Sequence, residues 1–166
     1  MKRIPIFLFL FAILVCDPAS AKDLNARVSM SDGSPSAATQ APDGSAVSFL
    51  FDRFIVGHGQ GQSPEKSATI LFNSPKSPAT GYTLLNVRGF VTARFGTRVT
   101  LNIMHEGRNH RFRLRSKTGG DFTKDIRIKR KTVDPVVLSV KLESVQWIKG
   151  NEGDTGGIDS IDVTFK

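Results

Sequence analysis

Residues 99–117, VTLNIMHEGRNHRFRLRSK, decide the expected fold because apolar and polar residues alternate on both sides of a turn signal. A period of two is typical of β-strands, and Gly107-Arg108 suits a type II′ turn with Gly in its first position. We therefore predict a hairpin of residues 99–105 and 110–117, in which His105 lies opposite His110.

This register sorts the side chains of the hairpin into two faces, which a slip by one residue would exchange. The inward face consists of Val99, Leu101, Ile103, Phe112 and Leu114. The outward face consists of Thr100, Asn102, Met104, Arg111, Arg113 and Arg115. We expect residues 83–95 to extend the sheet as a meander through the loop 96–98, which adds Phe90 and Arg94 to the outward face. The expected strand over 125–130 contributes Arg127 and Lys129 to this face if it lies next to the meander.

The same alternation recurs along the chain from residue 46, with Gly, Pro and Asn as punctuation. The expected strands are 46–56, 68–73, 83–95, 99–105, 110–117, 125–130, 136–148 and 158–165. About eight short strands without helices are typical of an all-β antiparallel sandwich or jelly roll. The apolar phase changes within 136–148, which predicts a bulge near Glu143-Ser144 that keeps Val145 and Trp147 on the core side.

The N-terminus has the pattern of a secretory signal. A basic start precedes an apolar run, Ile4 to Cys16, and an Ala-x-Ala cleavage site at 19–21. The run is shorter than the ~20 apolar residues that a membrane-spanning helix needs. We expect cleavage after residue 21 and a secreted or periplasmic protein. The alternative, a lipoprotein anchored at Cys16, is disfavoured by the bulky Val15 before it.

Residues 22–45 are rich in Ser, Ala, Pro, Gly and Asp and poor in large apolar side chains. Such a stretch buries too little surface to offset its ordering entropy, so we expect a flexible leader. Residues 46–166 then form the β-sandwich domain, since a chain of 166 residues is of one-domain size. The chain's single Cys excludes a disulfide framework.

The positive charge of the chain is concentrated in one segment. The chain has 23 Lys and Arg against 15 Asp and Glu, and residues 88–131 hold 13 of the former and 3 of the latter. The residues either solvate an outer sheet face or bind a polyanion. The candidate ligand-binding residues are Phe90, Arg94, Asn102, Arg111, Arg113, Arg115, Arg127 and Lys129. One Trp and one Tyr are too few for the stacking platform that single-stranded nucleic acid uses.

These observations favour an exported non-enzymatic module that binds an anionic polysaccharide or an acidic protein. The alternative is an envelope structural or adaptor protein. A hydrolase is less favoured because the chain has no nucleophile motif and no P-loop. His105 and His110 supply two of the three or four ligands that a zinc site needs. No cofactor is expected unless calcium binds the acidic loop of Asn151, Glu152, Asp154 and Asp159.

Residues 156–165, GGIDSIDVTF, are similar to the closing strand of galactose-binding-like jelly rolls, in which a turn leads into an Ile-Asp-x-Ile pattern. The resemblance implies a β-sandwich with ligand loops at one end and, often, a structural calcium ion. The resemblance covers only these ten residues, 156–165.

Overall fold

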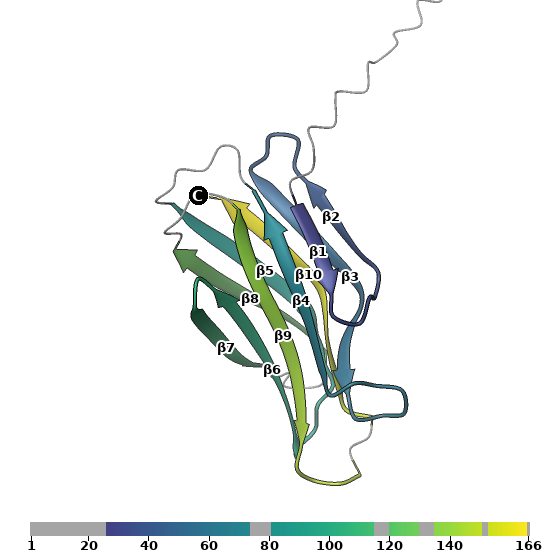
Figure 1. Cartoon of the computed structure of the whole chain (residues 1–166). Coiled ribbons are helices and arrows are strands. Elements are labelled where there is room, and N and C mark those ends of the chain that lie inside the picture. Colours follow the sequence, from purple (N-terminus) through teal and green to yellow (C-terminus); the bar gives the residue numbers. More distant parts are fainter. Residues whose placement is uncertain (1–25, 74–80, 115–119, 130–134, 151–152, 166) are drawn as a thin grey trace, which may run out of the picture.

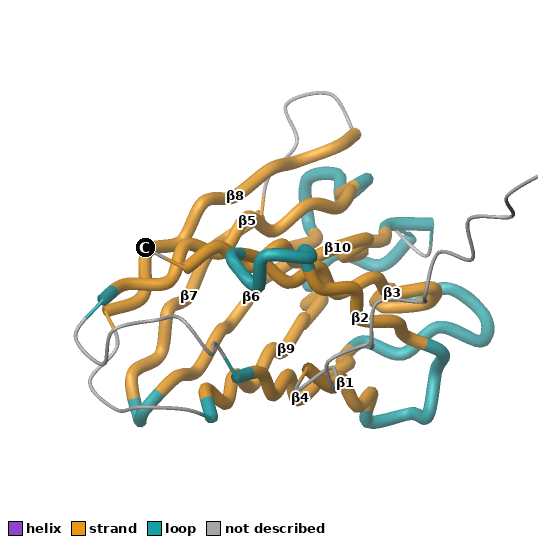
Figure 2. The backbone as a smooth tube through the Cα atoms, turned by 90° about the horizontal axis from the view of Figure 1, so that it is seen from above, coloured by secondary structure: helices purple, strands orange, loops and turns teal. Residues whose placement is uncertain are grey.

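The computed structural model describes residues 26–73, 81–114, 120–129, 135–150 and 153–165. Within these ranges the chain forms ten strands and no helix, so no described segment is a helix able to cross a membrane. The strands build two antiparallel sheets of five strands each, which lie face to face in Figure 2. The predicted all-β sandwich is confirmed, with ten strands in place of about eight.

The two sheets interleave along the sequence (Figure 1). The sheet that we call the β6 sheet has the order β1 (Ala26–Met30), β4 (Glu65–Phe72), β9 (Val136–Gln146), β6 (Thr97–His105) and β7 (Arg108–Leu114). The β5 sheet has the order β2 (Ser36–Gln40), β3 (Ala46–Gly57), β10 (Thr155–Phe165), β5 (Tyr82–Val91) and β8 (Gly120–Lys129). Each sheet turns one face toward the other and one face outward.

The core lies between the sheets and is built by the alternate apolar residues of each strand. Phe49 of the β5 sheet and Phe72 of the β6 sheet are fully buried, and their ring centroids lie 6.1 Å apart across the sandwich. Leu101 and Ile161 are likewise completely buried. Each such side chain contributes about 1.5–3 kcal/mol through burial. The alternate apolar residues of β10, Ile161 and Val163, are both fully buried.

The expectation of a flexible leader over 22–45 is wrong for most of that segment. Residues 26–30 form β1, which pairs with β4, and residues 36–40 form β2, which pairs with β3. Ala26 and Met30 are buried, so even this small-residue sequence adds to the core. The backbone of this segment forms hydrogen bonds with neighbouring strands. Side-chain hydrophobicity gives no sign of this contribution to stability. The expected signal, residues 1–21, and residues 22–25 lie outside the described residues.

The β6–β7 hairpin has a different turn from the predicted one. Glu106 and Gly107 occupy its centre with φ of 46° and 73°, which is the type I′ pattern of two positive φ angles. Consequently His105 lies opposite Arg108 and Ile103 lies opposite His110. The register is shifted by two residues, and because the side-chain period is also two, every residue keeps its predicted face.

The expected meander of 83–95 with 99–105 does not exist. β5 pairs with β8 and β10 in one sheet, whereas β6 pairs with β7 and β9 in the other. The segment between β5 and β6 therefore crosses from one sheet to the other. A core-facing alternation fits any antiparallel neighbour, so it does not identify which strand pairs with which.

The predicted bulge in residues 136–148 is also absent from β9. The β6–β9 register runs from Thr97 opposite Gln146 to Met104 opposite Ser139 without a shift. Val145 therefore points outward and is 44% exposed, and Trp147 beyond the strand is 51% exposed. A register shift occurs instead in β10, between Ile158 and Ser160.

Candidate anion-binding face

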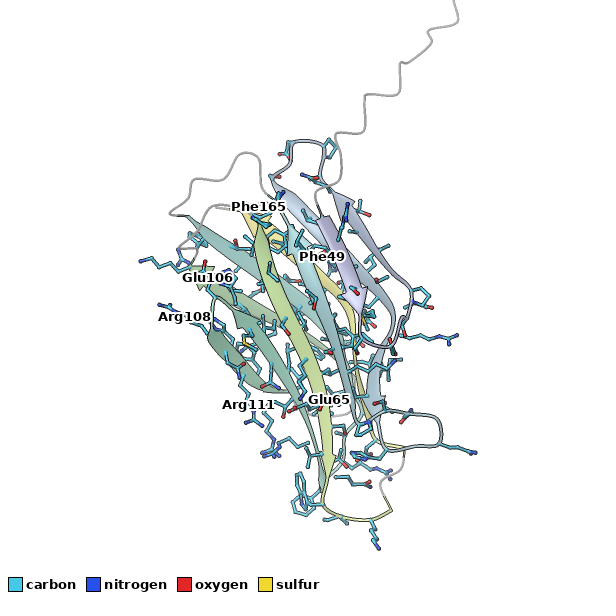
Figure 3. All side chains as sticks on the ribbon, in the orientation of Figure 1. Phe49, Glu65, Glu106, Arg108, Arg111 and Phe165 are labelled. Carbon is cyan, nitrogen blue, oxygen red and sulfur yellow. The ribbon has the colours of Figure 1, made fainter. Side chains whose placement is uncertain are left out.

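The outer face of the β6 sheet arranges polar side chains in rows that cross β7, β6 and β9. Asn102 of β6 lies between Arg111 of β7 and Lys141 of β9. One row away, Thr100 lies between Arg113 and Glu143. Strict alternation along each strand produces these rows, since every second residue of β6 faces outward. Figure 3 shows Arg111 extending away from the ribbon into solvent.

One part of this face neutralises its own charge. The Lys141 ammonium lies 2.7 Å from a Glu143 carboxylate oxygen and 2.8 Å from one of Glu65 on β4. The hydrogen bond from Lys141 holds the pKa of Glu143 below its usual value, and the bonds to Glu143 and Glu65 raise the pKa of Lys141. Asn102 donates from Nδ2 to Glu143 at 3.3 Å. Lys141 therefore already forms ion pairs with two acidic side chains of its own sheet.

Three arginines beside this network form no ion pair with a described residue: Arg98, Arg111 and Arg113, although the charge of Arg111 helps to lower the pKa of Glu143. Together with Thr100 they line a hollow of about 380 Å³, which we call the arginine hollow. The Nε atom of Arg98 is buried and lacks a hydrogen-bond partner. Because the three guanidinium groups form no ion pair with a described residue, the hollow carries a positive charge that favours an anionic ligand.

A second hollow of about 380 Å³ adjoins the first and shares Arg111 with it. Its polar lining consists of Asn102, Asn109, Arg111, Ser139, Lys141 and Glu143, with Met104 as the apolar member. Guanidinium groups bind carboxylate, sulfate and phosphate in a bidentate manner. A ligand with an anionic group in the arginine hollow and neutral polar groups in the second hollow would lie along the outer face of the β6 sheet. The two adjoining hollows therefore suit an extended ligand.

The structure divides the described members of the predicted ligand-binding set between the two outer sheet faces and, for Arg94, the end of the sandwich. Asn102, Arg111 and Arg113 share the outer face of the β6 sheet, as expected from the alternation. Phe90, Arg127 and Lys129 lie on the outer face of the β5 sheet, on the opposite side of the sandwich. Their placement on one face with the hairpin arginines is wrong because β5 belongs to the other sheet. Arg115 lies outside the described residues.

The outer face of the β5 sheet has no comparable excess of cations. Arg127 packs over the Tyr82 ring at 3.6 Å, and Arg88 forms an ion pair with Asp162. Two further acids, Asp121 and Asp125, face outward from β8. Acidic and basic side chains therefore alternate there, which leaves the β6 sheet as the anion-binding candidate.

Arg94 has a structural contact instead of a place on the binding face. Its Nε donates to Asp154 at 2.8 Å, and its backbone N–H donates to the same carboxylate at 3.0 Å. Asp154 is 1% exposed. Burial raises the pKa of Asp154, but the side-chain hydrogen bonds from Arg94 and Thr97 outweigh burial and leave the pKa below its usual value.

This contact bears on the calcium hypothesis, because Asp154 is already engaged by Arg94. Asp159 is exposed at the register shift of β10, and Asn151 and Glu152 lie outside the described residues. Among the described residues no three His, Cys, Asp or Glu side chains gather as a metal site would require. His105 is buried beside Glu106, and its burial lowers its pKa.

Arg98 is the functional candidate that sequence reasoning missed. It was assigned to the loop 96–98, although it alternates with Thr100 and Asn102 and so carries the signal of an outward strand position. Extending the strand by two residues would have placed it beside Arg111 and Arg113.

No protein-family model matches the chain, and no curated protein matches it. TmCBM61, solved in complex with β-1,4-galactotriose, is 18% identical with a TM-score of 0.39, and the match covers 85% of this chain and 88% of that one. The K1 cleaved adhesin domain of Lys-gingipain from Porphyromonas gingivalis W83 is 10% identical with a TM-score of 0.44, covering 86% and 91%. CBM35 from Paenibacillus barcinonensis is 17% identical with a TM-score of 0.29, covering 84% and 93%. At these values the likeness assigns no ligand to this chain.

Proposed function

We propose that this chain is an exported, non-catalytic module that binds an acidic polymer along the outer face of its β6 sheet. The observation that carries the proposal is the arginine hollow, which Arg98, Arg111 and Arg113 line together with Thr100 and in which none of the three arginines forms an ion pair with a described residue. Structural arginines elsewhere in the fold, such as Arg88 and Arg94, are paired.

An acidic polysaccharide suits the geometry better than a single small anion. The arginine hollow would receive a carboxylate or sulfate group, and the adjoining hollow offers the amide groups of Asn102 and Asn109 and the hydroxyl of Ser139 to neighbouring hydroxyl groups. Both hollows are open to solvent along the strands. A polymer can therefore enter from the side without threading.

The test compares two double variants with the same change in charge. Arg111→Ser/Arg113→Ser removes two cations from the arginine hollow, and Arg127→Ser/Lys129→Ser removes two from the outer face of the β5 sheet. Retention on immobilised heparin and alginate is measured in a salt gradient. Because all four side chains point away from the core, both variants should remain folded by circular dichroism.

We expect the hollow variant to elute at clearly lower salt than the parent and the control variant to elute close to it. Equal shifts in both variants would show that net charge alone drives retention, and no shift in either would show that this face binds no polyanion. Either result would refute the proposal.

A further inference from the structure

The end of the sandwich where β9 ends and β10 begins lies at the bottom of Figure 1, and four exposed apolar side chains belong to the segments at this end. Phe95 is 86% exposed, Trp147 51%, Val145 44% and Ile148 39%. We call these four residues the apolar tip. Soluble domains expose apolar side chains singly, so a cluster of this kind marks an interaction site.

The residues of the apolar tip come from two chain segments that are joined by a backbone hydrogen bond. The Trp147 N–H donates to the Gly96 carbonyl at 2.9 Å, which ties the β9–β10 connection to the β5–β6 connection. On the other side of Phe95, Arg94 is bound to Asp154 at 2.8 Å. A Cβ atom on Gly96 would lie 2.7 Å from the Ile148 side chain, so the two segments pack closely. The apolar side chains therefore project from a braced end of the sandwich.

Cationic residues flank the apolar tip. Arg94 precedes Phe95, Lys149 follows Ile148, and the Cα atom of Arg98 lies opposite that of Val145 in the β6–β9 ladder. Neither Arg98 nor Lys149 has an acidic partner among the described residues. The arginine hollow begins at Arg98, so its positive charge continues directly into the tip.

We propose that the apolar tip inserts into the interfacial region of a lipid bilayer that contains anionic lipids. Tryptophan and phenylalanine are favoured at this depth, and aliphatic side chains beside them reach the acyl boundary. The cations flanking the tip would contact anionic headgroups. Apolar contact and basic charge each give weak, reversible membrane binding, and together they give stable binding.

The composition of the tip argues against other occupants. Phe95 and Trp147 carry aromatic rings, but half of the tip, Val145 and Ile148, is aliphatic and forms neither the stacking contacts nor the hydrogen bonds that a sugar uses. Four side chains are also far fewer than the roughly 20–30 residues that each partner contributes to a stable protein interface. This inference goes beyond the proposed function, since bilayer insertion does not require that the arginine hollow bind a polymer.

The experiment uses the fluorescence of Trp147, which is the only tryptophan of the chain and so reports the tip alone. The chain without the expected signal, residues 22–166, is titrated with vesicles of phosphatidylcholine, with and without phosphatidylglycerol, and separately with dissolved heparin. Sedimentation of the vesicles measures the bound fraction. Phe95→Ser tests the tip at its most exposed side chain, and Val137→Ser, at an apolar residue 47% exposed near the start of β9, is the matched control; circular dichroism verifies that both variants are folded.

We expect a blue shift of Trp147 emission with the phosphatidylglycerol vesicles, and quenching by lipids brominated on their acyl chains. Loss of the Phe95 ring should weaken vesicle binding by about tenfold or more, whereas the Val137 variant should bind as the parent does. No shift with anionic vesicles would overturn the proposal. So would a shift with heparin but not with vesicles, which would assign the tip to the polymer, or unchanged vesicle affinity in Phe95→Ser.

Failure of this inference is distinguishable from failure of the proposed function. Arg111→Ser/Arg113→Ser can lose heparin retention while the Trp147 shift with vesicles persists, and Phe95→Ser can lose the vesicle response while heparin retention persists.

Discussion

Replacing Asp154 by Ala should destabilise the fold far more than replacing its partner Arg94 by Ala. Asp154 is 1% exposed and accepts hydrogen bonds from the Arg94 backbone N–H at 3.0 Å and from the Arg94 Nε at 2.8 Å. The bond from the backbone N–H to a buried carboxylate is worth about 1.5–3 kcal/mol. The guanidinium is 63% exposed, so screening limits its own pair to about 0–1 kcal/mol.

We therefore expect Asp154→Ala to lower the free energy of unfolding by about 2–4 kcal/mol and Arg94→Ala by about 1 kcal/mol or less. Arg94→Ala keeps the backbone N–H and the Thr97 hydroxyl as donors to the carboxylate, whereas Asp154→Ala leaves a backbone donor without its acceptor. Urea denaturation followed by circular dichroism measures both values. Equal losses in the two variants, or a loss below about 1 kcal/mol in Asp154→Ala, would refute the reasoning.

The pH dependence of the same pair gives a second readout. The pKa of Asp154 is lower in the folded chain than its usual value of 3.8. On acidification the unfolded state therefore binds this proton before the folded state does. The stability that the ionised carboxylate contributes is complete above pH 3.8 and is lost as the pH falls from 3.8 through the lower pKa of the folded state. The difference between the parent and Asp154→Ala should shrink in that acid range. A difference independent of pH would mean that packing, not the charge, accounts for the loss.

Two further predictions concern the β6–β7 hairpin. His105 is buried, which lowers its pKa below the usual 6.5, so protonation of the unfolded state should reduce stability as pH falls below that value. His105→Asn should flatten the pH dependence of the unfolding free energy between pH 6.5 and the lower folded-state pKa, and an unaltered slope would contradict this assignment. Glu106→Asn should raise the melting temperature, with a gain of about 0.5–1 kcal/mol, because Asn tolerates the positive φ of 46° better than Glu does. An unchanged or lower melting temperature would argue against strain in the turn.

The alternation of apolar and polar residues along each strand was enough to predict one part of the candidate site. Arg111, Arg113 and Asn102 share a face because the period of a strand is two, and even a wrong turn left that face intact. The additional members of the site, Lys141 and Glu143, come from β9, about forty residues away in the chain. No local pattern indicates that β9 lies beside β6, so the ion-pair network of Lys141 and Glu143 beside the arginines was not predictable.

The sequence by itself determined that this chain is an all-β sandwich with an apolar and a polar side to each strand, because hydrophobic burial enforces the period of each strand separately. The tertiary structure alone decided which strands are neighbours. Backbone hydrogen bonds are the same for every antiparallel pair, so pairing depends on how all ten strands fill two layers together. That choice moved Phe90, Arg127 and Lys129 to the opposite face, and it recruited β1 and β2 from a segment with little hydrophobic signal. An unshifted β9 left Val145 and Trp147 exposed beside the arginines.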